Sequence, residues 1–150
     1  MGVRVRRAPR APTHRGAVLA RLILDTTILV AAERASDSLD ELIVDDDDVA
    51  IAAVTAAELL VGVELANRRR RAARRSFVEA VLSSVTIEPY DLAVARHHAV
   101  LLAHVRRAGR PRGAHDLLIA ATATARSRFV VTHDAGGFAD LPGVEVRPSV

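Results

Sequence analysis

The sequence predicts a single α/β domain in which helices pack on a mainly parallel sheet. At 150 residues, 50% of them hydrophobic, the chain is long enough for one core and too short for two ordinary domains. Aromatic residues make up only 3%, so the core must be built from Leu, Ile, Val and Ala, which suits helices packed on a parallel sheet. Strand-like and helix-like segments alternate from residue 21 onward, as they do in βα units.

The first strand and helix are predicted at the start of this alternating pattern. Residues 22–24 form an apolar run of the kind that a buried strand requires, and the run ends in Asp25. Thr26 and Thr27 are suited to cap a helix that runs to Ala32, because their hydroxyls can accept hydrogen bonds from free backbone N–H groups.

The second strand and its helix follow an acidic segment. A short helix is expected over 38–44, and the four aspartates of 45–48 are interpreted as a solvated turn, because neighbouring carboxylates in a loop point apart. The apolar run 49–54 predicts a strand, and Thr55 is expected to cap a helix over 56–66.

A long helix is the best-signalled element of the second half. We expect a basic amphipathic helix over 68–83, a short strand over 85–87, and then the long helix up to Ala108, with Asp91 as its N-cap and Gly109 at its end. Its apolar face is predicted to comprise Leu92, Ala95, Ala99, Leu102 and Val105.

The last elements are a helix over 114–125, a strand over 129–132 and a final strand over 144–146, with a turn through Gly136 and Gly137 between the two strands. No internal repeat interrupts this order.

The basic charge of the chain is concentrated at its N-terminus. Six of the 21 basic residues lie in residues 1–21, where there is no acid, so the remainder has more acids than bases. Residues 1–21 also lack apolar periodicity, and we expect them to be a basic, disordered extension ahead of a domain over 22–150.

Absent residue types exclude several classes of protein. The chain has no cysteine, which removes disulfide frameworks, thiolate zinc sites and cysteine nucleophiles. It has no lysine, which argues against P-loop NTPases and phosphoacceptor domains, since both use a lysine near the phosphoryl group. No apolar run approaches the roughly 20 residues that span a bilayer, so we expect a soluble, cytoplasmic protein without membrane contact.

Four acids stand where this scaffold would place an active site. Asp25 ends the first strand, Glu58 lies in the first turn of the helix after the second, Asp116 opens a helix, and Asp134 follows the fourth strand. Each alone is explained as a cap or a helix-dipole partner, but Glu58 and Asp116 lie in nearly apolar helices, where a lone acid is unfavourable. Together they are expected to converge beyond the carboxyl ends of the strands.

A cluster of four carboxylates calls for a cation. Their mutual repulsion would raise pKa values and weaken the fold unless a positive ion neutralised it. Mg²⁺ or Mn²⁺ is the expected ion, because these hard cations take carboxylate, water and phosphate oxygens and assist phosphodiester displacement. Zinc, which prefers His and Cys, fits less well.

Motifs around these acids resemble those of the PIN-domain ribonucleases, in order and spacing, over residues 22–148. The matching segments are Leu22 to Val30, Thr55 to Gly62, His115 to Ala123, and Val131 to Asp134 with Phe138 and Leu141 to Val144. The resemblance implies a three-layer fold with a central sheet flanked by helices. It also implies Mg²⁺- or Mn²⁺-dependent cleavage of RNA, with Asp25, Glu58, Asp116 and Asp134 as catalytic metal ligands and Thr26 and Thr132 as supporting hydroxyls.

The chain resembles in particular the toxin half of VapBC toxin–antitoxin pairs. That resemblance implies a VapB-type antitoxin as partner, and a homodimer or a larger toxin–antitoxin assembly. A segment of the antitoxin is expected to cover the helices of 26–44 and 68–82, burying Leu39, Leu42 and Ile43, and to place an arginine in the acidic pocket. Two alternatives are a housekeeping PIN nuclease in RNA processing and a non-catalytic module that binds RNA or protein.

Overall fold

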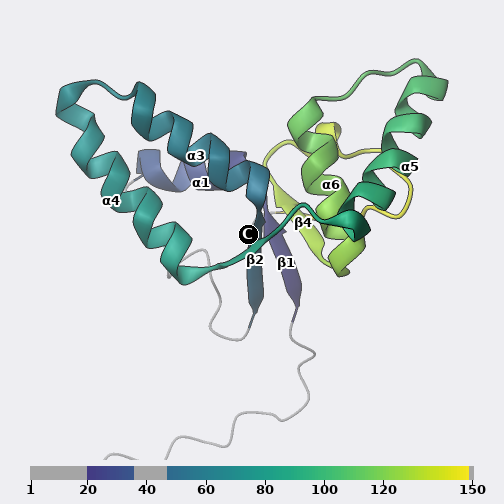
Figure 1. Ribbon diagram of the computed structural model, residues 1–150, viewed down its shortest axis with the longest axis horizontal. Coiled ribbons are helices and arrows are strands. Elements are labelled where there is room, and N and C mark those ends of the chain that lie inside the picture. The colour runs from purple at the N-terminus through teal and green to yellow at the C-terminus, as the bar shows by residue number, and fades with distance from the viewer. Residues whose placement is uncertain (1–19, 36–46, 149–150) are drawn as a thin grey trace, which may run out of the picture.

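A five-stranded parallel sheet forms the centre of the computed structural model, which describes residues 20–35 and 47–148 (Figure 1). The strand order is β3-β2-β1-β4-β5, and every neighbouring pair is parallel. The strands are β1 (Arg21–Leu24), β2 (Asp48–Ala52), β3 (Thr86–Glu88), β4 (Phe129–Thr132) and β5 (Val146–Pro148). The predicted α/β class is confirmed.

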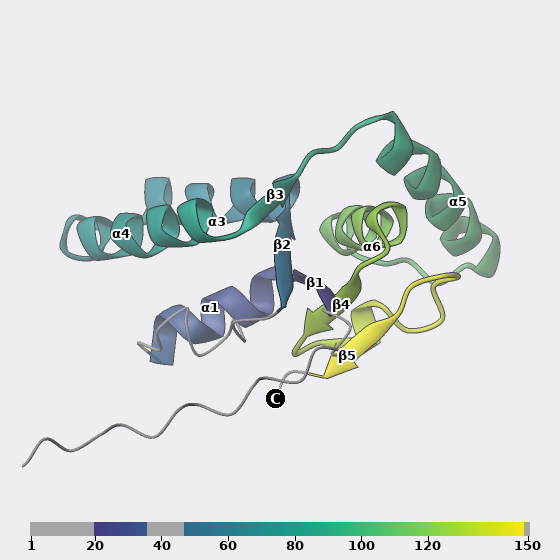
Figure 2. The same cartoon turned by 90° about the horizontal axis from the view of Figure 1, so that it is seen from below.

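Helices cover both faces of the sheet and give the fold three layers (Figure 2). The helices α1, α3 and α4 lie on one side, and α5 and α6 lie on the other. Their bounds are α1 (Thr26–Ala35), α3 (Ala53–Leu65), α4 (Arg68–Ser84), α5 (Leu92–Ala108) and α6 (Ala114–Arg126). Among the described residues, no helix is both long and apolar enough to cross a membrane.

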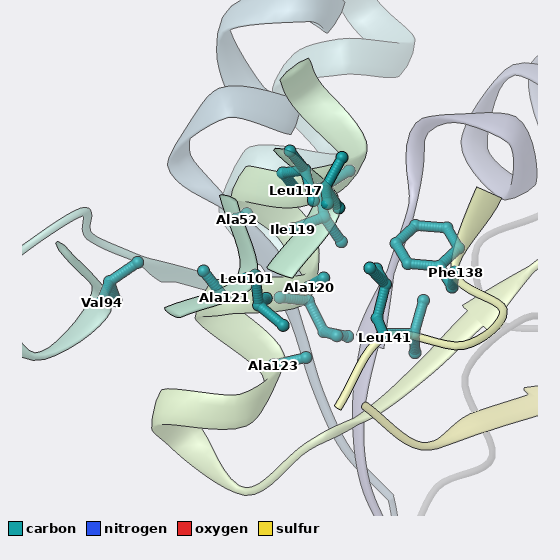
Figure 3. Close-up of a cluster of buried hydrophobic side chains, with 13 residues drawn as sticks. Ala52, Val94, Leu101, Leu117, Ile119, Ala120, Ala121, Ala123, Phe138 and Leu141 are labelled. Carbon is teal, nitrogen blue, oxygen red and sulfur yellow. The ribbon is translucent and has the colours of Figure 1, made fainter. Parts of the chain in front are cut away.

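Two apolar clusters, one on each face of the sheet, make up the core. Successive side chains of a strand point to opposite faces, so Leu22 and Leu24 join one cluster while Ile23 joins the other. Figure 3 shows the cluster that contains Ile23, in which Phe138 and Leu141 from the loop after β4 join Leu117, Ile119 and Ala120 of α6. Because both faces are buried, the strands appear in the sequence as continuous apolar runs.

The strand order determines where a site can form. The chain moves from β1 to β2 and β3 on one side and returns to β4 and β5 on the other, so the order reverses at β1. The carboxyl ends of β1 and β4 are therefore neighbours, with Leu24 opposite Val131. In open parallel sheets, the crevice at such a reversal is where ligands bind.

An ion-pair network lies across the sheet on the side of α6. Arg128, only 6% exposed, precedes β4, and its guanidinium donates to Glu88 Oε1 at 2.7 and 3.0 Å and to Asp48 Oδ1 at 2.9 Å. It also donates to the backbone oxygens of Leu22 and Asp48. Arg126 donates to the other Glu88 oxygen at 3.1 Å. Since Asp48 also accepts from Arg21, it is ion-paired at the start of β2, and its interpretation as part of a solvated turn is wrong.

The structure corrects two of the predicted helix caps. The helix α1 begins at Thr26, and Asp25 acts as its cap, because its Oδ1 accepts from Ile28 N at 3.3 Å. The helix α3 begins at Ala53, so Thr55 lies inside the helix, with a buried hydroxyl that has no partner among the described residues. The predicted caps of α5 are confirmed: Asp91 Oδ1 accepts from Val94 N, and Gly109 is left-handed with φ 64°.

The predicted apolar face of α5 is only partly right. Val105 is buried and Leu102 packs against the core, as predicted, but Val94 and Leu101 also belong to the buried face and Leu92 is 67% exposed. The helix packs mainly on α6, and its many alanines make several faces look apolar in the sequence. The helix around Glu58 is nearly apolar in the sequence, but it is not buried on all sides, because Leu60 and Leu65 are exposed.

Two of the strands begin later than predicted: β3 by one residue and β5 by two. The predicted helix 38–44, the aspartates 45 and 46, and residues 1–19 of the predicted N-terminal extension lie outside the described residues, and Arg21 is the first residue of β1.

Candidate active site

The four predicted acids meet at the carboxyl edge of the sheet. Asp25 directly follows β1 and Asp134 follows β4, while Glu58 and Asp116 come from α3 and α6 above that edge. The charges of Asp25, Asp134 and Glu58 each raise the pKa of Asp116, which places all four within reach of one another's fields.

Asp25 is the most firmly held of the four. It is 3% exposed, and its Oδ1 accepts from Thr27 Oγ1 at 2.5 Å and from Ile28 N, while its Oδ2 accepts from Thr132 Oγ1 at 2.5 Å. These donors fix the position of a buried carboxylate and compensate for its lost hydration. Thr27 and Thr132 also accept from the backbone N–H groups of His133 and Asp134, which ties the loop after β4 to the same cluster.

Glu58 is held by two side chains from other elements. The Thr26 hydroxyl at the start of α1 donates to Oε2, and the ring Nδ1 of His115 on α6 lies against Oε1. The two contacts connect α1, α3 and α6 through one carboxylate. Thr26 is thus close to the acids, as predicted, although it supports Glu58 and Thr132 supports Asp25.

Asp116 and Asp134 have no hydrogen bond to their carboxylates from the described residues. Both face Gly137 in the turn after β4, where a Cβ would lie 2.9 Å from Asp116 Oδ2 and 3.5 Å from Asp134 Oδ2. Gly113, just before α6, is similarly close to Asp116 Oδ2, at 3.2 Å. Two carboxylates therefore stand free above two glycines, and the other two are tied into the protein.

Burial and like charges destabilise the ionised form of Asp116. Its pKa is raised above the ordinary value of 3.8, first by burial and then by the charges of Asp25, Asp134 and Glu58, and His115 opposes the shift. An acid that binds its proton more tightly in the folded chain than in the unfolded chain loses stability as pH rises.

This raised pKa predicts how the Asp116→Asn variant differs from the wild-type protein with pH. Without metal, the stability gained by the variant should be absent well below pH 3.8, grow as pH rises through the raised pKa, and then level off. Urea unfolding of both proteins in EDTA over a pH series measures this difference, in which the titrations of groups distant from the four acids cancel. A difference that is constant with pH would contradict it.

Gly137 provides a sharper test of the geometry. In Gly137→Ala, the added Cβ would displace the carboxylate of Asp116, so we expect cleavage activity to fall while stability changes little, because the end of one half-buried side chain can move. Gly136→Ala is the matched control, since its Cβ would make only ordinary contact with Asp134, at 3.5 Å. RNA cleavage rates and melting temperatures measure both, and equal activity in the two variants would disprove the close approach.

The donor set fits a hard divalent cation that is only partly coordinated by protein. Among the described residues, no group of three or more His, Asp or Glu side chains stands ready to hold an ion. Mg²⁺ does not require one, because it keeps several waters and is held by one or two carboxylates plus substrate phosphates. The two free carboxylates near the fixed Asp25 supply such ligands, and the pKa of Asp116 is raised first by burial and then by its acidic neighbours, both of which a bound cation would offset.

Three contributors to the site were not assigned from the sequence. Thr27 binds Asp25 more closely than any other residue except Thr132, and its place two positions after Asp25 was the available signal. His115 was given no role from the sequence, where it only begins a matching segment, and it contacts Glu58 directly. Gly137 was expected only as a turn residue.

Comparisons with known proteins agree with this architecture. A family model described as the PIN domain matches residues 22–144. Ribonuclease VapC5 of Mycobacterium tuberculosis is 40% identical over 122 residues, which is 81% of this chain and 87% of that protein. The crystal structure of the VapBC-5 complex from the same organism aligns with a TM-score of 0.70 at 34% identity, covering 86% of this chain and 98% of the other. DNA-bound VapBC from Salmonella typhimurium aligns with a TM-score of 0.77 at 25% identity, covering 89% and 100%.

Proposed function

The chain belongs to the PIN-domain family and within it to the VapC ribonucleases, and on this basis we propose that it is a toxin that cuts RNA with Mg²⁺ or Mn²⁺. The observation that carries the proposal is the convergence of four acids from four separate elements on one edge of the sheet, two of them with free carboxylates. A purely structural role would not compensate for the electrostatic repulsion among four carboxylates.

Asp25 and Asp116 are the proposed main ligands of the ion, and Glu58 and Asp134 complete its surroundings directly or through water. When bound, the ion supplies charge that activates water and stabilises the leaving oxygen of a phosphodiester displacement. Thr27 and Thr132 keep the Asp25 carboxylate in one orientation, so that it does not have to reorganise as the substrate binds. Thr26 and His115 hold Glu58 in the same way.

A titration of Mn²⁺ against thermal stability tests the ion site without relying on activity. An ion that binds only the folded chain raises the melting temperature as its concentration increases. We expect such a rise for the wild-type protein and none for Asp116→Asn. A wild-type melting temperature that does not change with the concentration of Mn²⁺ or of Mg²⁺ would favour the non-catalytic alternative.

The relatives found as VapBC complexes suggest an antitoxin as the partner. A groove of about 510 Å³ between α1 and α4 offers it both basic and apolar side chains, since its lining comprises Glu33, Arg34, Arg69, Arg70, Ala73, Arg74 and Phe77. This supports the expectation that an antitoxin segment covers these helices; Leu39, Leu42 and Ile43 of the expected contact lie outside the described residues. An arginine of that segment would then reach the free carboxylates of Asp116 and Asp134 and displace the ion.

Expression in cells separates the toxin from a housekeeping nuclease. A toxin acting on cytoplasmic RNA should arrest growth when expressed alone, and co-expression of the protein encoded by the adjacent gene should restore growth. The size of the co-purified assembly in solution tests the proposed homodimer or larger complex. Harmless expression of the wild-type chain would support the housekeeping alternative.

A further inference from the structure

A second cavity lies on the side of the sheet that α5 and α6 cover, and Arg112 of its lining connects it to the loop after β4. It has a volume of about 320 Å³ and is formed by the end of α5, the loop before α6 and the loop after β4. Its lining comprises His104, Val105, Ala108, Arg110, Arg112, Asp140 and Leu141. Three of these side chains are basic and one is acidic, which distinguishes the cavity from the carboxylate cluster.

Arg112 is fixed at the boundary between this cavity and the acids. Its guanidinium donates to the backbone oxygens of Gly136 at 3.0 Å and Ala139 at 2.8 Å. Gly136 in turn lies next to Asp134, with 3.5 Å between its Cβ position and Asp134 Oδ1. Both acceptors are neutral, so the positive charge of Arg112 is not cancelled, and a guanidinium has five N–H donors, of which two suffice for these bonds.

Arg110 adds a second charge that is free of partners. The side chain is exposed, and it has no hydrogen bond or ion pair with any other residue in the described parts of the chain. The facing charged groups are Arg112, His104 and Asp140, and Asp140 forms no ion pair with either arginine. The cavity therefore keeps two guanidinium charges available to an anion from solvent.

The acids themselves create the need for such charges. RNA is a polyanion, and a pocket with four carboxylates repels it, so phosphates on either side of the cut must be held by cations nearby. The arginines of α4 lie on the opposite side of the sheet from α5 and α6, so they would hold phosphates only on the other flank of the cut (Figures 1 and 2). Arg71 and Arg74 of that helix are moreover bonded to backbone oxygens at the end of α3 and to Glu33.

We infer that this cavity is a phosphate-binding subsite. In it, Arg110 and Arg112 hold a phosphodiester group that lies in the same RNA strand as the phosphodiester being cut and flanks it. The inference rests on the proposed ribonuclease function. Arg112 is oriented in advance by its two carbonyl partners, and Arg110 closes on the phosphate from the exposed side.

Binding of RNA to Asp116→Asn tests the subsite without cleavage. The probe is a short fluorescent single-stranded RNA, and the readout is its anisotropy over a range of salt concentrations. Adding Arg110→Met should weaken binding about 3- to 10-fold and reduce the slope of log K against log salt by about 0.7, as expected for one lost phosphate contact on a single strand. Adding Arg110→Lys should retain the slope, because the charge remains.

Arg107→Met is the matched control, since it removes the same charge from the exposed end of α5 without touching the cavity. It should leave both affinity and slope close to those of the parent. In the active protein, Arg110→Met should raise KM and leave kcat unchanged.

The subsite is disproved if Arg110→Met binds RNA like its parent or if Arg107→Met loses as much affinity. A loss of antitoxin binding by Arg110→Met, with RNA binding unchanged, would also overturn it and assign the cavity to a protein partner. A wild-type protein that binds RNA but never cuts it would refute the proposed function, and the anisotropy comparison would still decide the subsite.

Discussion

Replacing Asp116 by Asn is expected to reduce RNA cleavage by on the order of 10³-fold while leaving the fold intact. Asn has the same shape, and the Asp116 carboxylate has no hydrogen bond to lose among the described residues, so the substitution removes one negative charge and little else. Because that charge is opposed by three neighbouring acids, stability without metal should rise above pH 3.8. Single-turnover cleavage and urea unfolding measure the two effects.

Glu79→Gln is a suitable control, because it makes the same change at an exposed position on α4. It should alter neither cleavage nor stability appreciably.

Asp25→Asn should also abolish cleavage, but unlike Asp116→Asn it should lower the stability of the fold. Asp25 accepts three hydrogen bonds, and an amide cannot accept from both hydroxyls and the backbone N–H as a carboxylate does. Cleavage that survives in Asp116→Asn at ordinary Mg²⁺ concentrations would contradict the role of this residue.

Replacing Arg128 by Met should destabilise the protein by about 3–5 kcal/mol. Arg128 is buried and bonds to Glu88, Asp48 and two backbone oxygens, so its loss leaves the carboxylate of Glu88, itself 8% exposed, with Arg126 as its remaining partner. Without Arg128, the buried carboxylate of Glu88 is only partly compensated by Arg126, so the folded state bears more of the desolvation penalty of that charge.

Two comparisons make the effect of Arg128 specific. Arg21→Met breaks an exposed ion pair with Asp48 and should lower the unfolding free energy by about 1 kcal/mol or less. The double variant Arg128→Met with Glu88→Gln should recover part of the loss, because the buried and only partly compensated charge of Glu88 is then absent. Urea unfolding at pH 7 measures all three. A loss below about 1 kcal/mol for Arg128→Met would show that the buried network adds little to stability.

The strands and the acids could be predicted because their signals are local. A strand buried on both faces must be apolar throughout, as 22–24 is, and a carboxylate at the end of such a run is conspicuous. The family motifs then supplied the order of Asp25, Glu58, Asp116 and Asp134. Their convergence follows from parallel strands, whose carboxyl ends share one edge of the sheet.

The features that the sequence did not reveal depend on distant residues. Arg128 pairs with Glu88, 40 positions away, and nothing near either residue indicates the other. Gly137 resembles any turn glycine until Asp116 of another element packs against it. The buried face of α5 depends on how α6 packs against a helix rich in alanine. Asp25, rather than Thr26 or Thr27, caps α1 because its carboxylate accepts a hydrogen bond from Ile28 N.

Cleavage of a single-stranded RNA by the wild-type protein, with Mg²⁺ or with EDTA, tests the central claim most directly. We expect internal cuts with Mg²⁺ or Mn²⁺ and none in EDTA, because the ion would activate the attacking water and stabilise the leaving oxygen. A DNA of the same sequence in a parallel reaction shows whether the sugar matters. Cleavage that is equally fast in EDTA, or an intact RNA in the presence of both metals, would contradict the account of this chain as a metal-dependent ribonuclease.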